Sequence, residues 1–115
     1  MDESILDNIK ELLGGEAENY DPFDNDLRVH INTALATLWQ LGIGAKNFYL
    51  TDDSQTWSDF LGSDVNLPMV KDFVYFNVKL AFDPPNNSFL LESYKSTLAE
   101  LTWRLHVQVE TDSLN

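Results

Sequence analysis

Apolar residues in the first part of the chain recur at spacings that place them on one face of an α-helix. One such stretch runs from residue 3 to Gly14 and Gly15, and another opens with the acids of residues 24–26 and runs to Gly42. Acidic side chains favour a helix start, and glycine favours a helix end. We therefore predict two amphipathic helices joined by a polar loop over residues 16–23. Their apolar stripes are Ile5, Leu6, Ile9, Leu12 and Leu13 in the first, and Leu27, Ile31, Ala34, Leu35, Leu38 and Leu41 in the second.

A second pair of helices is predicted on either side of Pro84 and Pro85. The stretch 69–82 is apolar around well over half of its circumference, which is typical of a central helix. The prolines end it because a proline nitrogen has no proton to donate. The last helix begins near Asn87 or Ser88, and from about residue 108 the alternation of apolar and polar residues allows an extended or flexible tail. The stripe of this helix keeps a heptad spacing through Leu91, Tyr94, Leu98, Leu101 and Leu105.

Residues 43–55 show no helical periodicity and are predicted to form a loop or a pair of short strands. The loop leads into "TWSDFLG", where Thr56 can cap a short helical turn that ends at Gly62. Trp57 and Phe60 then share one face of the turn, and we expect them to pin the loop onto the helix of residues 69–82. The fold class is all-α: one domain over residues 1–115, a small bundle of four helices plus this turn, with the irregular loop between the second and third main helices.

Composition agrees with a folded domain of this kind. The chain has 115 residues, of which 43% are hydrophobic, and it has no cysteine, which excludes disulfides, thiolate catalysis and cysteine-based zinc sites. The N-terminus is acidic where a signal peptide is basic, and no apolar run approaches the roughly 18 residues that span a bilayer. We expect a soluble protein, made in a cytosol, without a membrane partner.

Charge is the most unusual property of the sequence. The net charge is −12, and residues 1–26 contain nine acids against Lys10 alone. So negative a surface argues against binding to nucleic acid or anionic lipid through charge. Part of the surface should be strongly negative.

The histidines and aspartates do not form a catalytic or metal-binding pattern in the sequence. His30 and His106 lie on different predicted helices without metal-ligand spacing. The acids of residues 21–26 are followed by Leu27 and Arg28 where a calcium loop needs oxygen ligands and glycine. Adjacent acids at positions 52 and 53 have no nucleophile nearby. We therefore predict no catalytic residue, no cofactor and no metal, and a protein that is not an enzyme.

Aromatic residues are more numerous than a small core needs, and protein interfaces are the usual place for exposed aromatics. Trp103 lies off the heptad stripe of the last helix, as do the two valines that follow it, and two aromatics lie in the irregular loop. The candidate interface residues are Trp103, Val107, Val109, Phe48 and Tyr49.

Several strings in this order resemble the small head-tail connector proteins of tailed bacteriophages, also called adaptor, head-completion or DNA-packaging proteins. The resemblance covers roughly residues 5–110. It rests on "ILDNIKELLG", "FDNDLRVHINTALATLWQLGIG", "TWSDFLG", "VKDFVYFNVKLAFDPP" and "LAELTWRLHVQVE".

The resemblance implies a helical adaptor without catalytic residues, located in the virion at the head-tail junction and made in the host bacterial cytoplasm. It implies a ring of about a dozen copies under the portal vertex that closes the DNA-filled head. Its partners would be further copies of itself, the portal protein, and a tail or stopper protein. DNA would pass nearby without being bound specifically.

Acidity suits such a role because carboxylates near a channel repel the phosphates of passing DNA. The competing interpretation is an acidic mimic of nucleic acid that inhibits a host nuclease, although a mimic should space its acids along one extended face. A helical module without an assembly role is the third interpretation. The candidate channel-facing acids are Glu11, Glu16, Glu18, Asp52 and Asp53.

Overall fold

The computed structural model describes residues 3–19, 21–62 and 67–113. Within these ranges the chain forms six α-helices and one short 3-10 helix, η1, and no strand, which confirms the predicted all-α class. The elements are α1 (Ile5–Leu13), α2 (Gly15–Asn19), η1 (Asp21–Phe23), α3 (Asp24–Gln40), α4 (Trp57–Leu61), α5 (Leu67–Phe82) and α6 (Ser88–Ser113).

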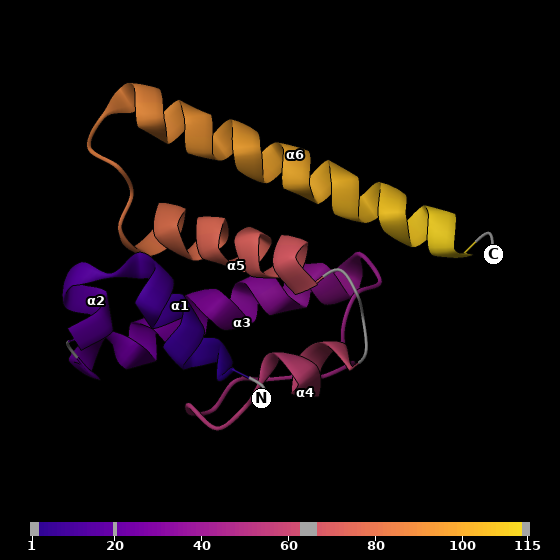
Figure 1. Ribbon diagram of the computed structural model, residues 1–115, viewed down its shortest axis with the longest axis horizontal. Coiled ribbons are helices and arrows are strands. Elements are labelled where there is room, and N and C mark those ends of the chain that lie inside the picture. The colour runs from indigo at the N-terminus through magenta and orange to yellow at the C-terminus, as the bar shows by residue number, and fades with distance from the viewer. Residues whose placement is uncertain (1–2, 20, 63–66, 114–115) are drawn as a thin grey trace.

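The helices are arranged in layers around α5. Figure 1 shows α6 running antiparallel to α5 on one side, with α3 and α1 on the other side. Buried apolar side chains come from α1 to α5 and from the loop before α4, whereas α6 contributes Leu105. In the part of the chain that the structure describes, no helix combines the length and apolarity that a bilayer crossing needs.

The prediction of a polar loop over residues 16–23 is wrong, because α2 and η1 occupy most of this segment. Gly14 and Gly15 adopt φ values of +67° and +57°, in the left-handed region that favours glycine, so the chain turns sharply and enters α2 at once. Ala17 of α2 is buried against the core. Elements this short have too few residues to show a periodic apolar stripe, so periodicity could not predict them.

Helix α3 anchors the irregular loop. It buries Leu27, Ile31, Ala34, Leu35 and Leu38, five residues of the predicted stripe. Leu50 in the loop donates its backbone N–H to Oδ1 of Asn32 at 2.7 Å, and its carbonyl accepts from Nδ2 of the same side chain at 3.1 Å. Of the two predicted alternatives for residues 43–55, the loop is the one observed, since the only β-type pairing among the described residues is an isolated bridge between Ser4 and Thr56.

The predicted capped turn is present as α4. The Thr56 side chain accepts from the backbone N–H of Asp59, whose carboxylate accepts from the N–H of Thr56. Trp57 is buried and donates its indole Nε1–H to Oδ1 of Asn8 in α1 at 3.0 Å, while the ring of Phe60 meets Phe48 edge to face at 5.3 Å. The sequence favoured the helix of residues 69–82 as the cover for both aromatics. Both aromatics belong to the same buried core as Phe73 and Val74 of that helix, and the contacts with Asn8 and Phe48 also join α4 to α1 and to the loop.

Helix α5 begins and ends close to its predicted bounds, and α6 begins where it was predicted to begin. Asn87 caps α6 by accepting the backbone N–H groups of Phe89 and Leu90 at 2.8 and 3.2 Å. Leu105 is fully buried, and the other members of the heptad stripe are half-buried. Helix α6 continues to Ser113, so residues 108–113 are helical and not the extended segment that their alternation allowed.

Candidate assembly surfaces

The outer face of α6 carries the most exposed large aromatics of the described chain. The Trp103 side chain is 66% exposed, and Phe89 near the start of the helix is 80% exposed. Trp103 and Val107 line one wall of a hollow of about 400 Å³, which Met69 of α5 also lines. These two predicted interface residues therefore share one surface.

Val109 is placed differently from the other two candidates on α6. It packs against the core, and its Cγ1 lies 3.0 Å from the position that a Cβ on Gly42 would occupy. Val109 follows Leu105 by four residues, and residues four apart on a helix share a face. It therefore belongs with the buried stripe and offers little surface to a partner.

The two loop aromatics also differ from one another. Phe48 is half-buried and packs on Phe60, so it forms part of the contact between loop and α4. Tyr49 is 64% exposed. Of this pair, Tyr49 is the side chain that a partner can reach.

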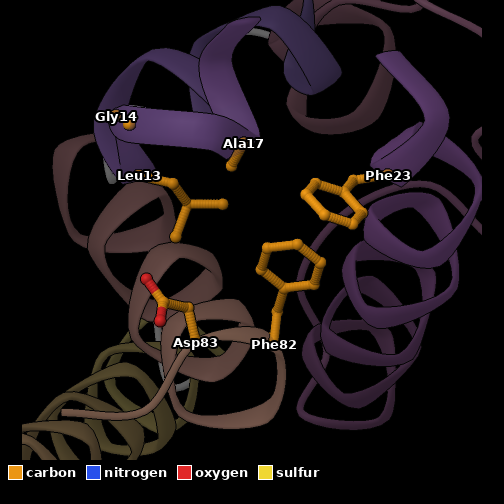
Figure 2. A pocket seen from close by; sticks show the side chains of 7 residues that line it. Leu13, Gly14, Ala17, Phe23, Phe82 and Asp83 are labelled. Carbon is orange, nitrogen blue, oxygen red and sulfur yellow. The ribbon is translucent and has the colours of Figure 1, made fainter. Parts of the chain in front are cut away.

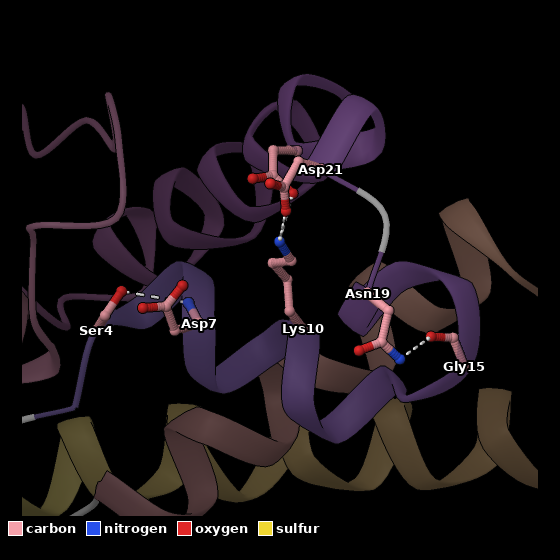
Figure 3. A network of polar contacts seen from close by, with 7 residues as sticks. Ser4, Asp7, Lys10, Gly15, Asn19 and Asp21 are labelled. Carbon is pink, nitrogen blue, oxygen red and sulfur yellow. Dashed lines mark hydrogen bonds and ion pairs between the residues drawn. The ribbon is translucent and has the colours of Figure 1, made fainter.

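The buried Lys10 side chain pairs with two of the N-terminal acids, the exposed Asp21 and the half-buried Asp24. Its Nζ lies 3.1 Å from Oδ1 of Asp21 and 2.8 Å from Oδ1 of Asp24, and its side chain is only 10% exposed (Figure 3). The hydrogen bond to Asp24 is the largest cause that raises the pKa of the Lys10 ammonium above its ordinary value. These acids therefore tie η1 and α3 to α1, which explains them without a calcium site.

The candidate channel-facing acids come from three segments, namely α1, α2 and the loop before α4, and the four whose side chains are described are exposed. Burial, and after it the charge of Asp53, raises the pKa of the Asp7 carboxyl in the first turn of α1. Glu11 and Glu18 are exposed on the last turn of α1 and on α2, and the side chain of Glu16 lies outside the described residues. Hydrogen bonds from the Ser54 hydroxyl and backbone N–H lower the pKa of Asp52, which keeps that carboxylate ionised.

A second hollow, which the sequence did not reveal, lies between the α1–α2 turn and the end of α5. It has a volume of about 420 Å³. Figure 2 shows Leu13, Ala17, Phe23 and Phe82 pointing into it, and the two phenylalanine rings meet edge to face at 5.4 Å. Two features of the sequence could have indicated this hollow. They are the paired glycines at positions 14–15 and the apolar Phe23, which belongs to no predicted apolar stripe. We call this hollow the Phe23–Phe82 pocket.

Reactive groups do not converge on either hollow. Among residues 3–19, 21–62 and 67–113, no group of three or more His, Cys, Asp or Glu side chains could hold a metal ion. His106 pairs with Glu110 one turn away at 3.0 Å, on the surface of α6. The described surface instead carries hollows lined in part by apolar side chains, together with exposed aromatics, which are typical of proteins that assemble with other chains.

Comparison with known proteins defines the class further. A family model described as phage connector protein matches residues 5–112, which is nearly the whole chain. The chain therefore belongs to the phage connector protein family, as its resemblance to head-tail connectors predicted. No match was found among curated proteins or among solved structures.

Proposed function

We propose that this protein is a structural component of a phage virion that forms a ring of about a dozen copies under the portal vertex. The ring closes the DNA-filled head and provides the surface on which the tail, or a stopper protein, docks. The observation that carries this proposal is the family match over residues 5–112. The protein works by shape and contact and not by catalysis.

The distribution of exposed apolar residues supports assembly. Trp103 and Phe89 on α6 and Tyr49 in the loop are each more than 60% exposed. Aromatic side chains dominate the energetics of protein interfaces when a partner removes them from water. A subunit with such residues on two separate elements has surfaces for both a neighbouring copy and the portal protein.

The charge supports passage of DNA without binding. The net charge of −12 is multiplied in a ring, so a lumen lined or flanked by these subunits repels phosphates. Repulsion of this kind depends on the summed charge of the acids that face or flank the channel and not on the position of any one of them. The exposed acids Glu11, Glu18, Asp52 and Asp53 contribute to it, and we propose that they face or flank the channel.

Attachment to portal-bearing capsids is the direct test of the connector role. We expect the purified protein to associate with capsids that carry the portal and to be absent from capsids assembled without it, measured by co-sedimentation and by counting copies per particle. A mass measurement of the protein with and without isolated portal protein gives the stoichiometry. A protein that stays monomeric and ignores the portal would contradict the proposal.

Charge reversal separates a connector from an acidic mimic of nucleic acid. Glu11→Gln or Glu18→Gln alone should leave assembly intact, whereas Glu11→Lys combined with Glu18→Lys should make the assembled protein retain duplex DNA in a salt-sensitive way. The matched control reverses Glu92 and Glu110 on α6, which we expect to retain less DNA. Tight DNA binding by the wild-type protein, or stoichiometric capture of a host nuclease, would support the mimic instead.

A further inference from the structure

The Phe23–Phe82 pocket has the residues of a binding site for an aromatic side chain whose neighbour in the sequence is a cation. Leu13, Ala17, Phe23 and Phe82 form its apolar part, and Asp83 places a carboxylate at its edge, beside Leu13 (Figure 2). The Asp83 side chain is 63% exposed and is paired with Lys79 at 2.9 Å. Space beside Gly14 and Gly15 is empty, with no atom within 4 Å of a Cβ at either position, so the pocket opens to solvent there.

Among the exposed aromatics of the described chain, one has a cation directly next to it in the sequence. Trp103 is followed directly by Arg104, whose side chain is 59% exposed and is paired with Glu100 at the surface at 2.8 Å. Phe89 is exposed to a greater extent, but its nearest lysine or arginine in the sequence is Lys95. Charge complementarity to the Asp83 carboxylate therefore favours the pair formed by Trp103 and Arg104 over Phe89.

The two features lie toward opposite ends of the molecule. The pocket is at the end of α5, next to the start of α6, and Trp103 lies about 22 Å farther along α6 than Ser88, at a rise of about 1.5 Å per residue. Figure 1 shows α1, α2 and the end of α5 at one end, with the C-terminal half of α6 extending toward the other. A side chain at one end and its socket at the other cannot meet within one subunit.

We propose that Trp103 of one copy of this chain enters the Phe23–Phe82 pocket of the next copy, where Arg104 pairs with Asp83. This inference rests on the proposed function, since it supplies the contact between neighbouring subunits. The contact is heterologous, because each copy presents a different surface to each neighbour. Such contacts propagate head to tail and close into a ring when the rotation between subunits allows it.

Substitution of the aromatic is the first test. Trp103→Ala should weaken self-association by about thirtyfold or more, as expected for an aromatic anchor in a pocket, without changing the melting temperature of the subunit. Phe89→Ala removes an even more exposed aromatic from the same helix and should leave self-association unchanged. On the socket side, Ala17→Leu should fill the pocket and weaken association in the same way. Equal behaviour of Trp103→Ala and the wild type would overturn the proposal.

Exchange of the two charges tests the pairing itself. Asp83→Arg and Arg104→Asp should each reduce association by about tenfold or more, because each brings like charges together in the contact. A chain that carries both substitutions should recover most of the lost association. A double variant as weak as the product of the two single variants would show that the two positions do not meet.

Cross-linking distinguishes a head-to-tail contact from a symmetric dimer. The chain has no cysteine, so Asp83→Cys with Arg104→Cys introduces the only two thiols. A short bismaleimide should then produce a ladder of covalent oligomers beyond the dimer. Single-cysteine variants are the control and should give no ladder. A product that stops at the dimer would overturn the head-to-tail contact.

The failure of this inference and the failure of the proposed function have different signatures. If the wild type and Trp103→Ala both attach to portal-bearing capsids with the same number of copies, the connector role stands and the Trp103 contact is wrong. If the wild type neither self-associates nor attaches to such capsids, the proposed function fails, and the contact that rests on it fails too.

Discussion

Helix α6 and the layer formed by α1, α3 and α4 both carry many apolar and aromatic side chains, but the layer buries them in the core and α6 leaves most of them partly or fully exposed. Helix α3 buries five apolar side chains in 17 residues, whereas α6, the longest helix with 26 residues, buries only Leu105 among its described residues. Helix α6 packs chiefly on one neighbour, α5. The longest element therefore contributes a single fully buried side chain to the core, and most of its described side chains are exposed.

The polar contacts of the two regions differ in the same direction. In the core layer, Asn8 and Lys10 are buried, and both bond to elements distant in the sequence. On α6 the ion pairs join residues one turn apart at the surface, as in Arg104 with Glu100. Surface pairs of this kind contribute little to stability. Specific polar contacts thus join the elements of the core layer, whereas α6 packs on α5 mainly through an apolar stripe. We therefore expect α6 to unfold locally at a lower free energy than the core layer.

The largest effect is expected from Trp57→Ala in the core layer. The substitution should lower the free energy of unfolding by about 3 to 5 kcal/mol, since it leaves a cavity, and it also removes the hydrogen bond to Asn8. Urea denaturation followed by circular dichroism measures the change. Trp57→Phe keeps most of the volume and should lose about 1 to 3 kcal/mol through the unpaired amide oxygen.

The control for this substitution is Tyr49→Ala, which removes an exposed aromatic from the neighbouring loop and should stay within about 0.5 kcal/mol of the wild type. Should Trp57→Ala unfold at the same urea concentration as the wild type but fail to assemble, Trp57 would be an interface residue and the contrast between core and surface aromatics would be lost.

Local patterns predicted the elements that are long enough to show them. Stripes and caps located α1, α3, α5 and α6, and the Thr56 signature located α4. They could not predict which residues meet across the fold. The partner of Trp57 is Asn8, 49 positions earlier in the chain. No local spacing encodes that contact.

The candidate surfaces show the same limit. Trp103 was correctly placed on the outside because it lies off the stripe, but Val109 was treated as part of an extended tail, and the helical continuation returns it to the buried face. The Phe23–Phe82 pocket was missed because its walls come from three separate segments. Two of those segments are elements too short for periodicity to reveal.

A smaller and more local effect is expected from Leu105→Ala. It removes the one fully buried anchor of α6 among the described residues, and the cost should fall near the lower end of about 2 to 5 kcal/mol, because α6 can shift toward α5. Native-state hydrogen exchange should show lost protection in α6 and retained protection in α3. Leu38→Ala, at an equally buried site in α3, should lower protection in both helices. Equal loss in both helices for Leu105→Ala would show that α6 does not open separately.

The smallest effect concerns charge, where the two regions again differ. On α6, Glu92 and Glu100 are paired with Lys95 and Arg104 about one turn away. Asp7 at the start of α1 instead experiences the negative charge of Asp53. Burial, and after it this repulsion, raises the pKa of the Asp7 carboxyl above its ordinary value of 3.8. A raised carboxyl pKa means that ionisation destabilises the fold, so the penalty is present at neutral pH and disappears as the pH falls through that pKa. Asp53→Asn should therefore lower the Asp7 pKa.

The same substitution should stabilise the protein by about 0.2 to 0.5 kcal/mol at pH 7, a small gain because solvent screens exposed charges. The gain should vanish below the ordinary carboxyl range. Glu100→Gln on α6 removes an acid of similar exposure that faces Arg104, and it should give no gain at any pH. NMR titration of Asp7 and urea denaturation at several pH values measure both results. If Glu100→Gln stabilised as much as Asp53→Asn, the benefit would come from lower net charge alone, and the distinction between opposed acids near α1 and paired acids on α6 would not hold.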